Sequence, residues 1–280
     1  MKILITGGNG NIAKIIRKHM DIDNTYEIYA PSHKDLDVMD YDSVKNYIDD
    51  INPYIIIHTA IIGGRRTKDE TSDVVYKNLL MFENIIKCSE NVRMIINLDS
   101  AAIYDRNGDI FCRREDELYT VPKDYYGFSK YLICKRTREY DNIYNFRIFN
   151  IFHINEENDR FIKACFLAKK NDAKFIINDD KYFDFMYEND FIKILKYYVN
   201  NFDRKKLDKT INICYKKKYK LSEIVKLIEN IGIYKKIDVE IINEKSKFNY
   251  CGDPTILNSI QEIDLDGLEN CLIKYSALLE

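Results

Sequence analysis

The sequence predicts an α/β fold in which a doubly wound parallel sheet is joined to a smaller α/β lobe. Short apolar segments alternate with longer amphipathic ones through the first half of the 280 residues. Such alternation is typical of parallel strands, because each parallel connection needs a crossover, usually a helix. After about residue 155 the spacing of the segments changes, which predicts the second lobe.

The elements of the first half are predicted from apolar runs and from helical periodicity. Residues 2–6 and 54–57 are short apolar runs of the kind that forms buried parallel strands. Residues 69–89 carry apolar side chains on one helical face, which predicts a long helix. The same patterns predict further strands at 26–30, 93–98 and 144–149 and helices at 11–20, 41–50 and 125–141.

The second lobe is predicted from three helices that alternate with three short strands. The helices are expected at 159–170, 189–200 and 221–231, and the strands at 173–177, 210–214 and 237–242. We place the boundary at residue 155. Residues 1–155 then form the sheet domain, and residues 156–280 form mainly the smaller lobe.

Composition argues against several kinds of partner. The formal net charge is −2 with 31% charged residues, so no surface for nucleic acid is expected. The seven Cys contain no Cys-x-x-Cys pair, which indicates reduced thiols without a metal site or disulfides. No apolar run reaches the roughly 18 residues of a membrane span, and the first residues lack the pattern of a signal peptide. We therefore expect a cytoplasmic protein that does not bind membranes.

A glycine-rich turn follows the first predicted strand. In Gly7-x-x-Gly10-x-x-Ala13, the first Gly allows a tight turn and the second lets the backbone approach a phosphate. The small third residue lets helix and strand pack, and the positive helix end faces the pyrophosphate. This pattern predicts a Rossmann-type dinucleotide site in which Gly7, Gly10, Asn11 and Ile12 contact the cofactor. A glycine turn without a ligand is the alternative.

The end of the second predicted strand bears on the choice of dinucleotide. An NAD-specific site usually has a carboxylate there, bound to the 2′-hydroxyl of the adenosine ribose. No carboxylate occurs before Asp35, whereas Ser32, His33 and Lys34 could accommodate a 2′-phosphate. We therefore expect NADP(H) to be preferred over NAD(H), which stays possible. A plain solvated turn is the competing explanation of these residues.

A Tyr and a Lys are placed for proton transfer. Tyr126 and Lys130 are four residues apart in a predicted helix and therefore share one face. A Lys charge beside a phenol favours the phenolate, which makes Tyr126 a usable general acid or base. Lys130 can also hydrogen-bond the nicotinamide ribose. Ser100 follows the strand at 93–98, at the carboxyl edge of the sheet, and its hydroxyl can bind a carbonyl oxygen and stabilise an alkoxide.

With these motifs the chain resembles the extended short-chain dehydrogenase/reductases, the NAD-dependent epimerase/dehydratase family. The resemblance spans nearly the whole chain and includes the Thr-Gly-Gly-x-Gly start, segments 36–40 and 58–60, the Ser-x-x-x-Tyr element at 100–104, the Tyr/Lys pair, and the Asp-Phe segment at 184–190. It implies that Asp37 and Val38 lie against adenine and that Ala60 contacts the cofactor. It also implies contacts with the substrate from Ser100, Ala101, Asn150 and Lys163.

Within this family, segments 60–64 and 78–86 are most similar to the GDP-fucose synthase subgroup, which reduces and epimerises a GDP-linked 4-keto-6-deoxy sugar. The resemblance implies an NADPH-dependent reductase of a nucleoside-diphosphate 4-keto sugar, with a GDP-linked substrate favoured. It also implies a homodimer through the helices around Asn78 and Tyr126.

Three positions depart from that subgroup. Ala102 stands where the subgroup has its epimerisation acid/base Cys, Phe183 replaces an Arg, and His153 replaces a Gly after Asn150. These departures leave reduction intact and put epimerisation in doubt. The alternatives are a bifunctional 3,5-epimerase/4-reductase, a nucleotide-sugar 4-epimerase that keeps its cofactor, and a non-catalytic regulator that binds the cofactor.

Overall fold

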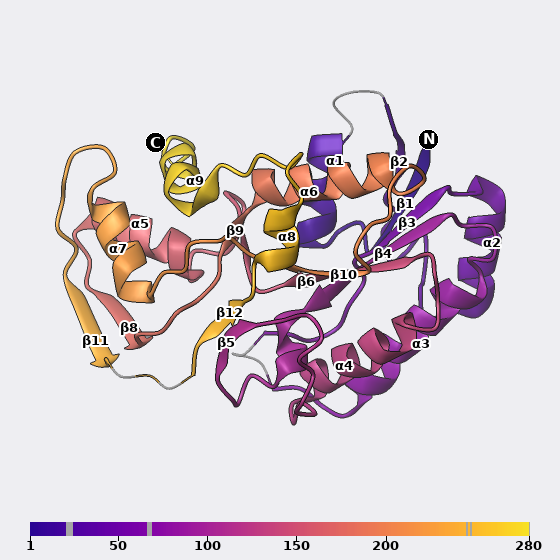
Figure 1. The fold of residues 1–280 in the computed structure, drawn as a ribbon, viewed down its shortest axis with the longest axis horizontal. Helices are drawn as coiled ribbons and strands as arrows, with labels where there is room; N and C mark the ends of the chain where they lie inside the picture. The colour runs from indigo at the N-terminus through magenta and orange to yellow at the C-terminus, as the bar shows by residue number, and fades with distance from the viewer. Residues whose placement is uncertain (21–24, 66–68, 245, 247, 280) are drawn as a thin grey trace. The chain divides into compact units, whose positions relative to one another are not determined.

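The central sheet has six strands in the order β10-β6-β4-β3-β1-β2, five of them from the first 150 residues (Figure 1). β1 (Lys2–Thr6) lies between β2 (Glu27–Tyr29) and β3 (Ile55–His58), and β3 pairs with β4 (Met94–Ser100), all in parallel. The computed structural model describes residues 1–20, 25–65, 69–244, 246 and 248–279. The predicted doubly wound parallel sheet is confirmed.

Helices cover both faces of this sheet. On one face lie α2 (Tyr41–Ile51), α3 (Asp73–Lys87) and α4 (Tyr125–Thr137), and on the other lie α1 (Asn11–Met20) and the end of α6 (Glu188–Asn201), as Figure 1 shows. The core beneath the first three helices is formed by buried apolar residues of strands and helices, among them Leu4, Ile56, Ile95, Val44, Phe82 and Ile133.

The chain divides into two units, and each is built from separated segments. Unit 1 consists of Met1–Arg106, Leu118–Arg147 and Lys196–Ile211, and unit 2 of Asn107–Glu117, Ile148–Leu195 and Asn212–Glu280. The end of α6 and the start of β10 (Thr210–Ile213) thus belong to the unit of the sheet. Tyr198 of α6 packs edge-on against Phe146 of β6 (Ile143–Ile148), with ring centroids 4.9 Å apart.

In its described residues, unit 2 contains three pairs of short parallel strands. β7 (Ile151–Phe152) pairs with β9 (Met186–Tyr187), β8 (Phe175–Asp179) with β11 (Val239–Asn243), and β5 (Ile110–Arg113) with β12 (Tyr250–Gly252). Its helices are α5 (Phe161–Asn171), the start of α6, α7 (Leu221–Glu229), α8 (Thr255–Ser259) and α9 (Gly267–Ser276).

A buried ion pair connects the strands and helices of unit 1. Arg147 in β6 and Asp99 in β4 have fully buried side chains, and Arg147 Nε donates to Asp99 Oδ2 at 3.0 Å. The guanidinium also donates to Tyr104 Oη at 2.6 Å and to Cys134 Sγ at 3.4 Å. Tyr104 ends the 3₁₀ helix η2 (Ala101–Tyr104), and Cys134 lies in α4. Arg147 therefore holds β4, β6, η2 and α4 together.

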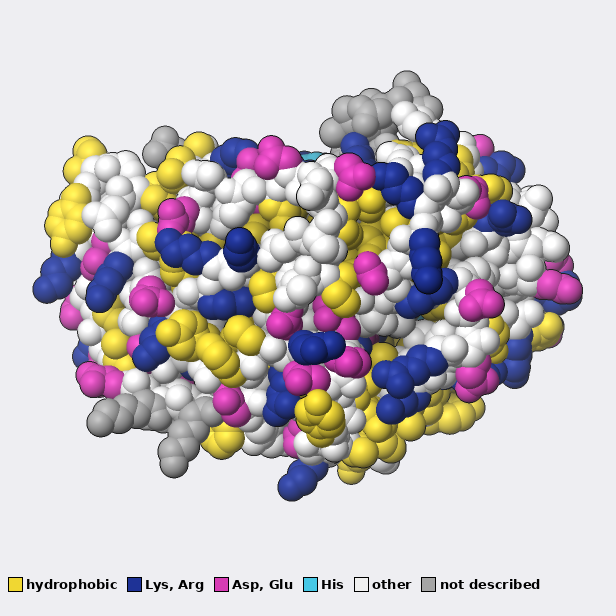
Figure 2. Space-filling view, viewed as in Figure 1, with side chains coloured by type: hydrophobic (Ala, Val, Ile, Leu, Met, Phe, Trp, Pro, Cys, Tyr) yellow, Lys and Arg dark blue, Asp and Glu magenta, His cyan; other side chains and the backbone are white. Residues whose placement is uncertain are grey.

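The surface carries charges of both signs. Figure 2 shows Lys and Arg side chains interspersed with Asp and Glu on the face that it draws. This mixture agrees with the small formal net charge of −2. Among the described helices, none is both long and apolar enough to cross a membrane.

Replacing Arg147 with Met is expected to destabilise the protein strongly. The variant leaves the Asp99 carboxylate buried without its cation, a defect that typically costs about 3–5 kcal/mol. Urea denaturation followed by circular dichroism measures the change. Arg136→Met is the matched control, because the ion pair of Arg136 with Glu83 is partly exposed and contributes far less. Similar losses in both variants would contradict the argument that burial sets the cost.

Candidate functional site

The glycine turn between β1 and α1 leaves little room for a side chain at Gly7 and none at Gly8. Gly7 has a φ of +66°, in the left-handed region, and its carbonyl oxygen accepts from the Gly10 N–H at 2.8 Å. The Gly8 N–H donates to Pro31 O at 3.0 Å, and a Cβ on Gly8 would lie 2.1 Å from the carbonyl oxygen of the residue before Pro31. The end of β2 is thereby held against the turn. Asn11 remains exposed at the start of α1, where an anion can meet the helix N-terminus.

Ala60 lies beside this turn. A Cβ on Gly7 would be 3.0 Å from Ala60 Cα. Thr6 Oγ1 accepts from the backbone N–H groups of Thr59 and Ala60, both at 3.2 Å, and Thr59 Oγ1 donates to Thr6 O at 2.6 Å. The structure therefore brings two predicted cofactor residues, Gly7 and Ala60, together at the carboxyl ends of β1 and β3. Ile12 is half-buried in the first turn of α1.

The turn after β2 carries the residues expected to select the dinucleotide. Ser32 N and Oγ donate to Asp35 Oδ2 at 3.1 and 2.6 Å, and these hydrogen bonds lower the pKa of Asp35. His33 Nδ1 lies 3.6 Å from Asp37 Oδ1, and Lys34 is exposed. Ser32 thus has a carboxylate partner inside the turn that the sequence pattern does not indicate.

Asp37 and Val38 lie in the segment that leads into α2. Asp37 Oδ1 accepts from the Met39 N–H at 2.9 Å. Val38 is buried, and its carbonyl oxygen accepts from Asn84 Nδ2 of α3 at 3.2 Å. These bonds fix the backbone of the segment against α3, while its expected contact with adenine stays a prediction.

α4 begins at a cap that places Tyr126 in its first turn. Asp124 Oδ1 accepts from the Gly127 N–H at 2.8 Å, so the carboxylate satisfies a helix N–H and complements the helix dipole. A Cβ on Gly127 would lie 2.8 Å from Ala102 O. This close approach lets α4 lie against η2, which begins directly after Ser100. The predicted Tyr and Ser are therefore carried by elements in contact.

Ser100 is both the last residue of β4 and the cap of η2. Its Oγ accepts from the Ala102 N–H at 3.2 Å, which leaves the hydroxyl hydrogen to donate. Ala101 and Ala102 are buried. Ser100 thus places a hydrogen-bond donor at the carboxyl edge of the sheet.

Lys130 is almost completely buried, with 3% of its surface exposed. Its Nζ donates to Leu98 O at 2.6 Å. Burial lowers the pKa of Lys130 from 10.5 to about 8, and the negative charge of Asp99 opposes part of this shift. Burial, and then the charge of Lys130, lower the pKa of His58 to about 3, so His58 is neutral where Nδ1 meets Thr6 Oγ1 at 3.0 Å. Lys130 therefore changes its charge in mildly alkaline solution.

Sequence reasoning missed the charged surroundings of Tyr126. Glu70 Oε2 accepts from the Tyr126 N–H at 3.1 Å, and Glu70 Oε1 accepts from the Gly64 N–H at 2.6 Å. The Arg106 guanidinium lies 5.5 Å from the centroid of the Tyr126 ring and pairs with Asp124. The glycines of segment 60–64 are a sequence signal for this group. Nothing in the spacing of the charged residues marks Glu70 or Arg106.

In unit 2, the two predicted substrate residues differ in their surroundings. Asn150 O accepts from the Met186 N–H at 2.8 Å, whereas the buried Asn150 Oδ1 has no hydrogen-bond partner among the described residues. Such an acceptor costs free energy unless a ligand or water satisfies it. Lys163 Nζ donates to the backbone oxygens of Ile154 and Glu156 at 3.0 and 2.7 Å. Lys163 therefore holds the segment that precedes α5 against the helix, a role that the sequence does not suggest.

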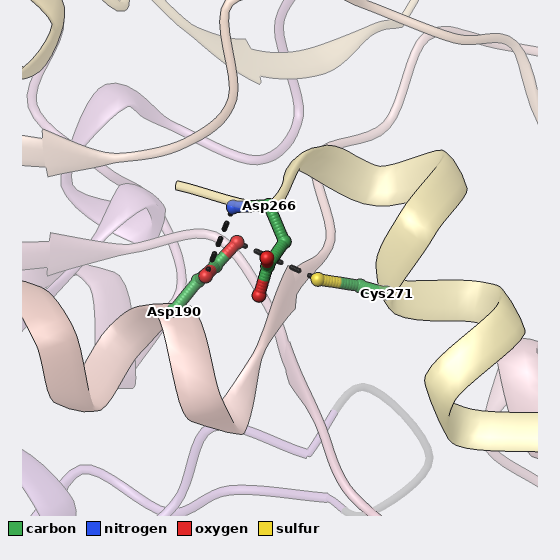
Figure 3. A group of neighbouring side chains, drawn as sticks. All are labelled: Asp190, Asp266 and Cys271. Carbon is green, nitrogen blue, oxygen red and sulfur yellow. Dashed lines mark hydrogen bonds between the residues drawn. The ribbon is translucent and has the colours of Figure 1, made fainter. Parts of the chain in front are cut away.

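One group of side chains in the described part of the chain has the spacing of metal ligands. Asp190, Asp266 and Cys271 have ligand atoms within 4.8 Å of one another (Figure 3). Asp190 accepts from the Asp266 N–H at 3.2 Å and from Cys271 Sγ at 3.5 Å. Lys193 Nζ lies 2.8 Å from Asp190 Oδ1 and 2.9 Å from Asp266 Oδ2. Lys274 Nζ also lies 2.7 Å from Asp266 Oδ2, so the two ammonium groups balance the two carboxylates, and the cluster joins α6 to α9.

A glycine turn follows β1, and contacting elements carry Ser100, Tyr126 and Lys130 at the carboxyl edge of a parallel sheet. This arrangement is typical of an NAD(P)-dependent enzyme. The chain belongs to the NAD dependent epimerase/dehydratase family, whose model matches residues 3–214. The family expected from the sequence is confirmed.

Similarity to individual proteins spans most of the chain. GDP-L-colitose synthase from Yersinia pseudotuberculosis is 25% identical over an alignment of 260 residues, and the match covers 84% of this chain and 83% of the relative. The structure of a dTDP-4-dehydrorhamnose reductase from Clostridium acetobutylicum matches with a TM-score of 0.81 and 18% identity, over 100% of this chain and 99% of that one. A GDP-mannoheptose C4 reductase from Campylobacter jejuni with NADP bound matches with a TM-score of 0.78 and 16% identity, over 99% and 98%.

The stability of the wild type relative to a Lys130→Met variant is expected to rise with pH above about 8. Burial lowers the pKa of Lys130 from 10.5 to about 8, so between these values the unfolded chain binds more protons than the folded one. The free energy of unfolding of the wild type therefore increases in that window, by up to about 1.4 kcal/mol per pH unit. The variant lacks this contribution. Urea denaturation at several pH values measures the difference.

Lys135→Met is the matched control for this experiment, because Lys135 is an exposed lysine of the same helix. Its stability relative to the wild type should stay nearly constant through the same window. A Lys130→Met difference that is equally constant would show that the Lys130 ammonium is not destabilised by burial.

Proposed function

We propose that the protein is an NADPH-dependent reductase of a nucleoside-diphosphate 4-keto sugar, a substrate class that includes 4-keto-6-deoxy sugars. The observation that carries this proposal is the buried Lys130 in the helix of Tyr126, packed against the segment that begins at Ser100. Carbonyl reduction needs a proton donor and a group that stabilises the developing negative charge. The three relatives described above are enzymes of nucleotide sugars, which supports the proposal.

Each residue of this set has a distinct part in the reduction. Ser100 donates a hydrogen bond to the carbonyl oxygen at C4, and Tyr126 gives its phenolic proton to that oxygen as it becomes an alkoxide. The positive charge of Lys130 favours the phenolate that remains, and a proton from solvent restores the phenol. Bound NADPH supplies the hydride.

We place the cofactor at the glycine turn, where the absence of Cβ atoms and the exposed start of α1 fit a pyrophosphate. Exposed Lys34 suits a 2′-phosphate, and the relative from Campylobacter jejuni binds NADP, so NADP(H) is the preferred cofactor and NAD(H) stays possible. The proposed contacts are Gly7, Gly10, Asn11, Ile12, Ala60 and Lys130, with Ser32, His33 and Lys34 at the 2′-phosphate and Asp37 and Val38 at the adenine.

We assign the sugar nucleotide to Ser100, Ala101, Asn150 and Lys163. The orphaned Asn150 Oδ1 is an acceptor that a ligand can satisfy, and Lys163 has used two of its three donors. Two of the relatives described above are named for GDP-linked sugars, which favours GDP. In this assignment residues 1–155 bind NADP(H), and residues 156–280 mainly bind the nucleotide sugar.

The proposed assembly is a cytoplasmic homodimer in which α3 and α4 pack against their copies. Its basis is the family resemblance noted in the sequence. Tyr76 of α3 is 66% exposed and Tyr125 of α4 is 43% exposed, so both helices carry aromatic surface that a symmetric contact can cover.

The Tyr126→Phe variant is expected to lose at least a hundredfold in NADPH-dependent turnover. General acid catalysis is typically worth about 10²–10⁴-fold, and Phe removes the proton donor while the ring keeps its packing. The measurement is NADPH oxidation with GDP-, UDP-, CDP- and dTDP-linked 4-keto sugars, and NADPH fluorescence shows that binding is nearly unchanged. Tyr125→Phe, at the exposed neighbouring position, is the matched control.

Other results would favour the alternatives. A Tyr126→Phe rate above about a tenth of the wild-type rate would remove Tyr126 from the mechanism. Nicotinamide retained on purification, with no net NADPH consumption, would favour the 4-epimerase. Cofactor binding without turnover of any sugar nucleotide would favour the non-catalytic regulator.

Reduction is expected without inversion at C3 or C5. Epimerisation removes a proton from a carbon beside the ketone and returns one to the opposite face, so it needs a second titratable group. Ala102 is buried and offers none. Turnover in D₂O, with the product followed by NMR, should show no deuterium at C3 or C5 beyond an enzyme-free control. Enzyme-dependent deuterium there would mean that another group, such as His153 or Lys163, acts as acid and base.

A further inference from the structure

Arg106 is a charged group placed over the ring of Tyr126. Its Cζ lies 5.5 Å from the ring centroid, and its side chain is 12% exposed. Nε and Nη2 donate to the two carboxylate oxygens of Asp124, and Nη1 donates to Gly64 O at 3.4 Å. Asp124 and Gly64, on different segments of unit 1, thus help to fix the guanidinium.

We infer that Arg106 is a positioning residue of the reductase site: it orients the Tyr126 ring and supplies a permanent positive charge that keeps the phenol ionisable in the working pH range. The inference rests on the proposed function, because it assumes that Tyr126 is the proton donor. A cation over an aromatic face is attracted by the ring, and a nearby cation favours the phenolate further. Arg106 acts through Tyr126 and not on the reacting atoms.

Charges of both signs surround Tyr126. Glu70 accepts from the Tyr126 N–H, and Asp124 accepts from the N–H of the next residue, so both carboxylates lie at the backbone end of Tyr126. Their negative charges oppose ionisation of the phenol. Arg106 and Lys130 are the cations that offset them. Among these four described groups, removal of Arg106 would leave Glu70 and Asp124 opposed by Lys130.

The two cations respond differently to pH. Burial lowers the pKa of Lys130 to about 8, so its charge is lost in mildly alkaline solution. A guanidinium stays protonated throughout this range. Above about pH 8, Arg106 therefore still offsets Glu70 and Asp124, whereas Lys130 does so less.

Arg106 also fixes the ring through Gly64. Gly64 has a φ of +95°, and a Cβ there would lie 3.0 Å from Tyr126 Cζ, so the Gly64 backbone packs against the phenol end of the ring. Glu70 holds the Gly64 N–H, and Arg106 holds the Gly64 carbonyl. Loss of the guanidinium therefore affects both the charge beside the phenol and the backbone that packs on it.

Two substitutions with opposite effects on charge test the inference. Arg106→Gln removes the cation, and Asp124→Asn removes the anion while Asn preserves the helix cap. NMR of tyrosine labelled at Cζ follows ionisation, with the Tyr126 signal assigned by its absence in Tyr126→Phe. We expect Arg106→Gln to raise the pH of ionisation by about one unit, a tenfold change in proton affinity, and Asp124→Asn to lower it. Arg106→Lys, which keeps a charge, should lie close to the wild type.

Arg106→Gln and Asp124→Asn break the same ion pair. If Arg106 had a purely structural role, the pH midpoint of Tyr126 ionisation would shift in the same direction in both variants or in neither. Either result would overturn the inference. So would a wild-type Tyr126 that does not ionise below the ordinary tyrosine value of about 10. If Arg106→Gln fails to fold, the Asp124→Asn variant decides the test. A pH midpoint of Tyr126 ionisation that is lower than in the wild type supports the inference, and an unchanged midpoint overturns it.

Turnover provides the second measurement. If the wild type reduces a 4-keto nucleotide sugar, the alkaline limb of its pH–rate profile should move in each variant with the NMR midpoint, and a limb that stays fixed would overturn the inference. If it reduces none, the proposed function fails, whereas the NMR titration still decides the effect of Arg106 on the phenol.

Discussion

One buried guanidinium connects the elements that carry the proposed catalytic residues. Arg147 of β6 binds Asp99 in β4, Tyr104 at the end of η2 and Cys134 in α4. A charge can be buried in this way only when it is paired and hydrogen-bonded. Asp99 also acts on Lys130, because its negative charge opposes the fall in the Lys130 pKa that burial causes. The stability of the sheet and the charge state of the site thus depend on the same ion pair.

The central sheet and the glycine turn between β1 and α1 could be predicted from the sequence because their signals are local. Apolar runs mark the buried strands, and the turn needs Gly7 for its positive φ and Gly8 for its contact with the end of β2. Spacing alone places Tyr126 and Lys130 on one face of α4. The depth at which Lys130 is buried could not be predicted, because it depends on how α4 packs against β4 and η2.

The surroundings of Tyr126 and much of unit 2 could not be predicted, for a different physical reason. Glu70 and Arg106 reach Tyr126 from loops, whose course is set by capping and hydrogen bonds and not by periodicity. β5, β7, β9 and β12 contain two to four residues each, too few for an alternating pattern to stand out. The sequence pattern does mark β10 as a strand, but its place beside β6 depends on pairing with a distant segment.

The late position of β10 in the chain has a consequence for biosynthesis. The ribosome makes β6 before β10, so the edge of β6 in the nascent sheet is unpaired until β10 has been made. Phe146 likewise stays exposed until Tyr198 of α6 can pack against it. Exposed edges and apolar surface make partly made chains prone to aggregate. Unit 1 can therefore be completed only after β10 has been made, and a fragment that stops near residue 155 lacks the end of α6 and the strand that pairs with β6.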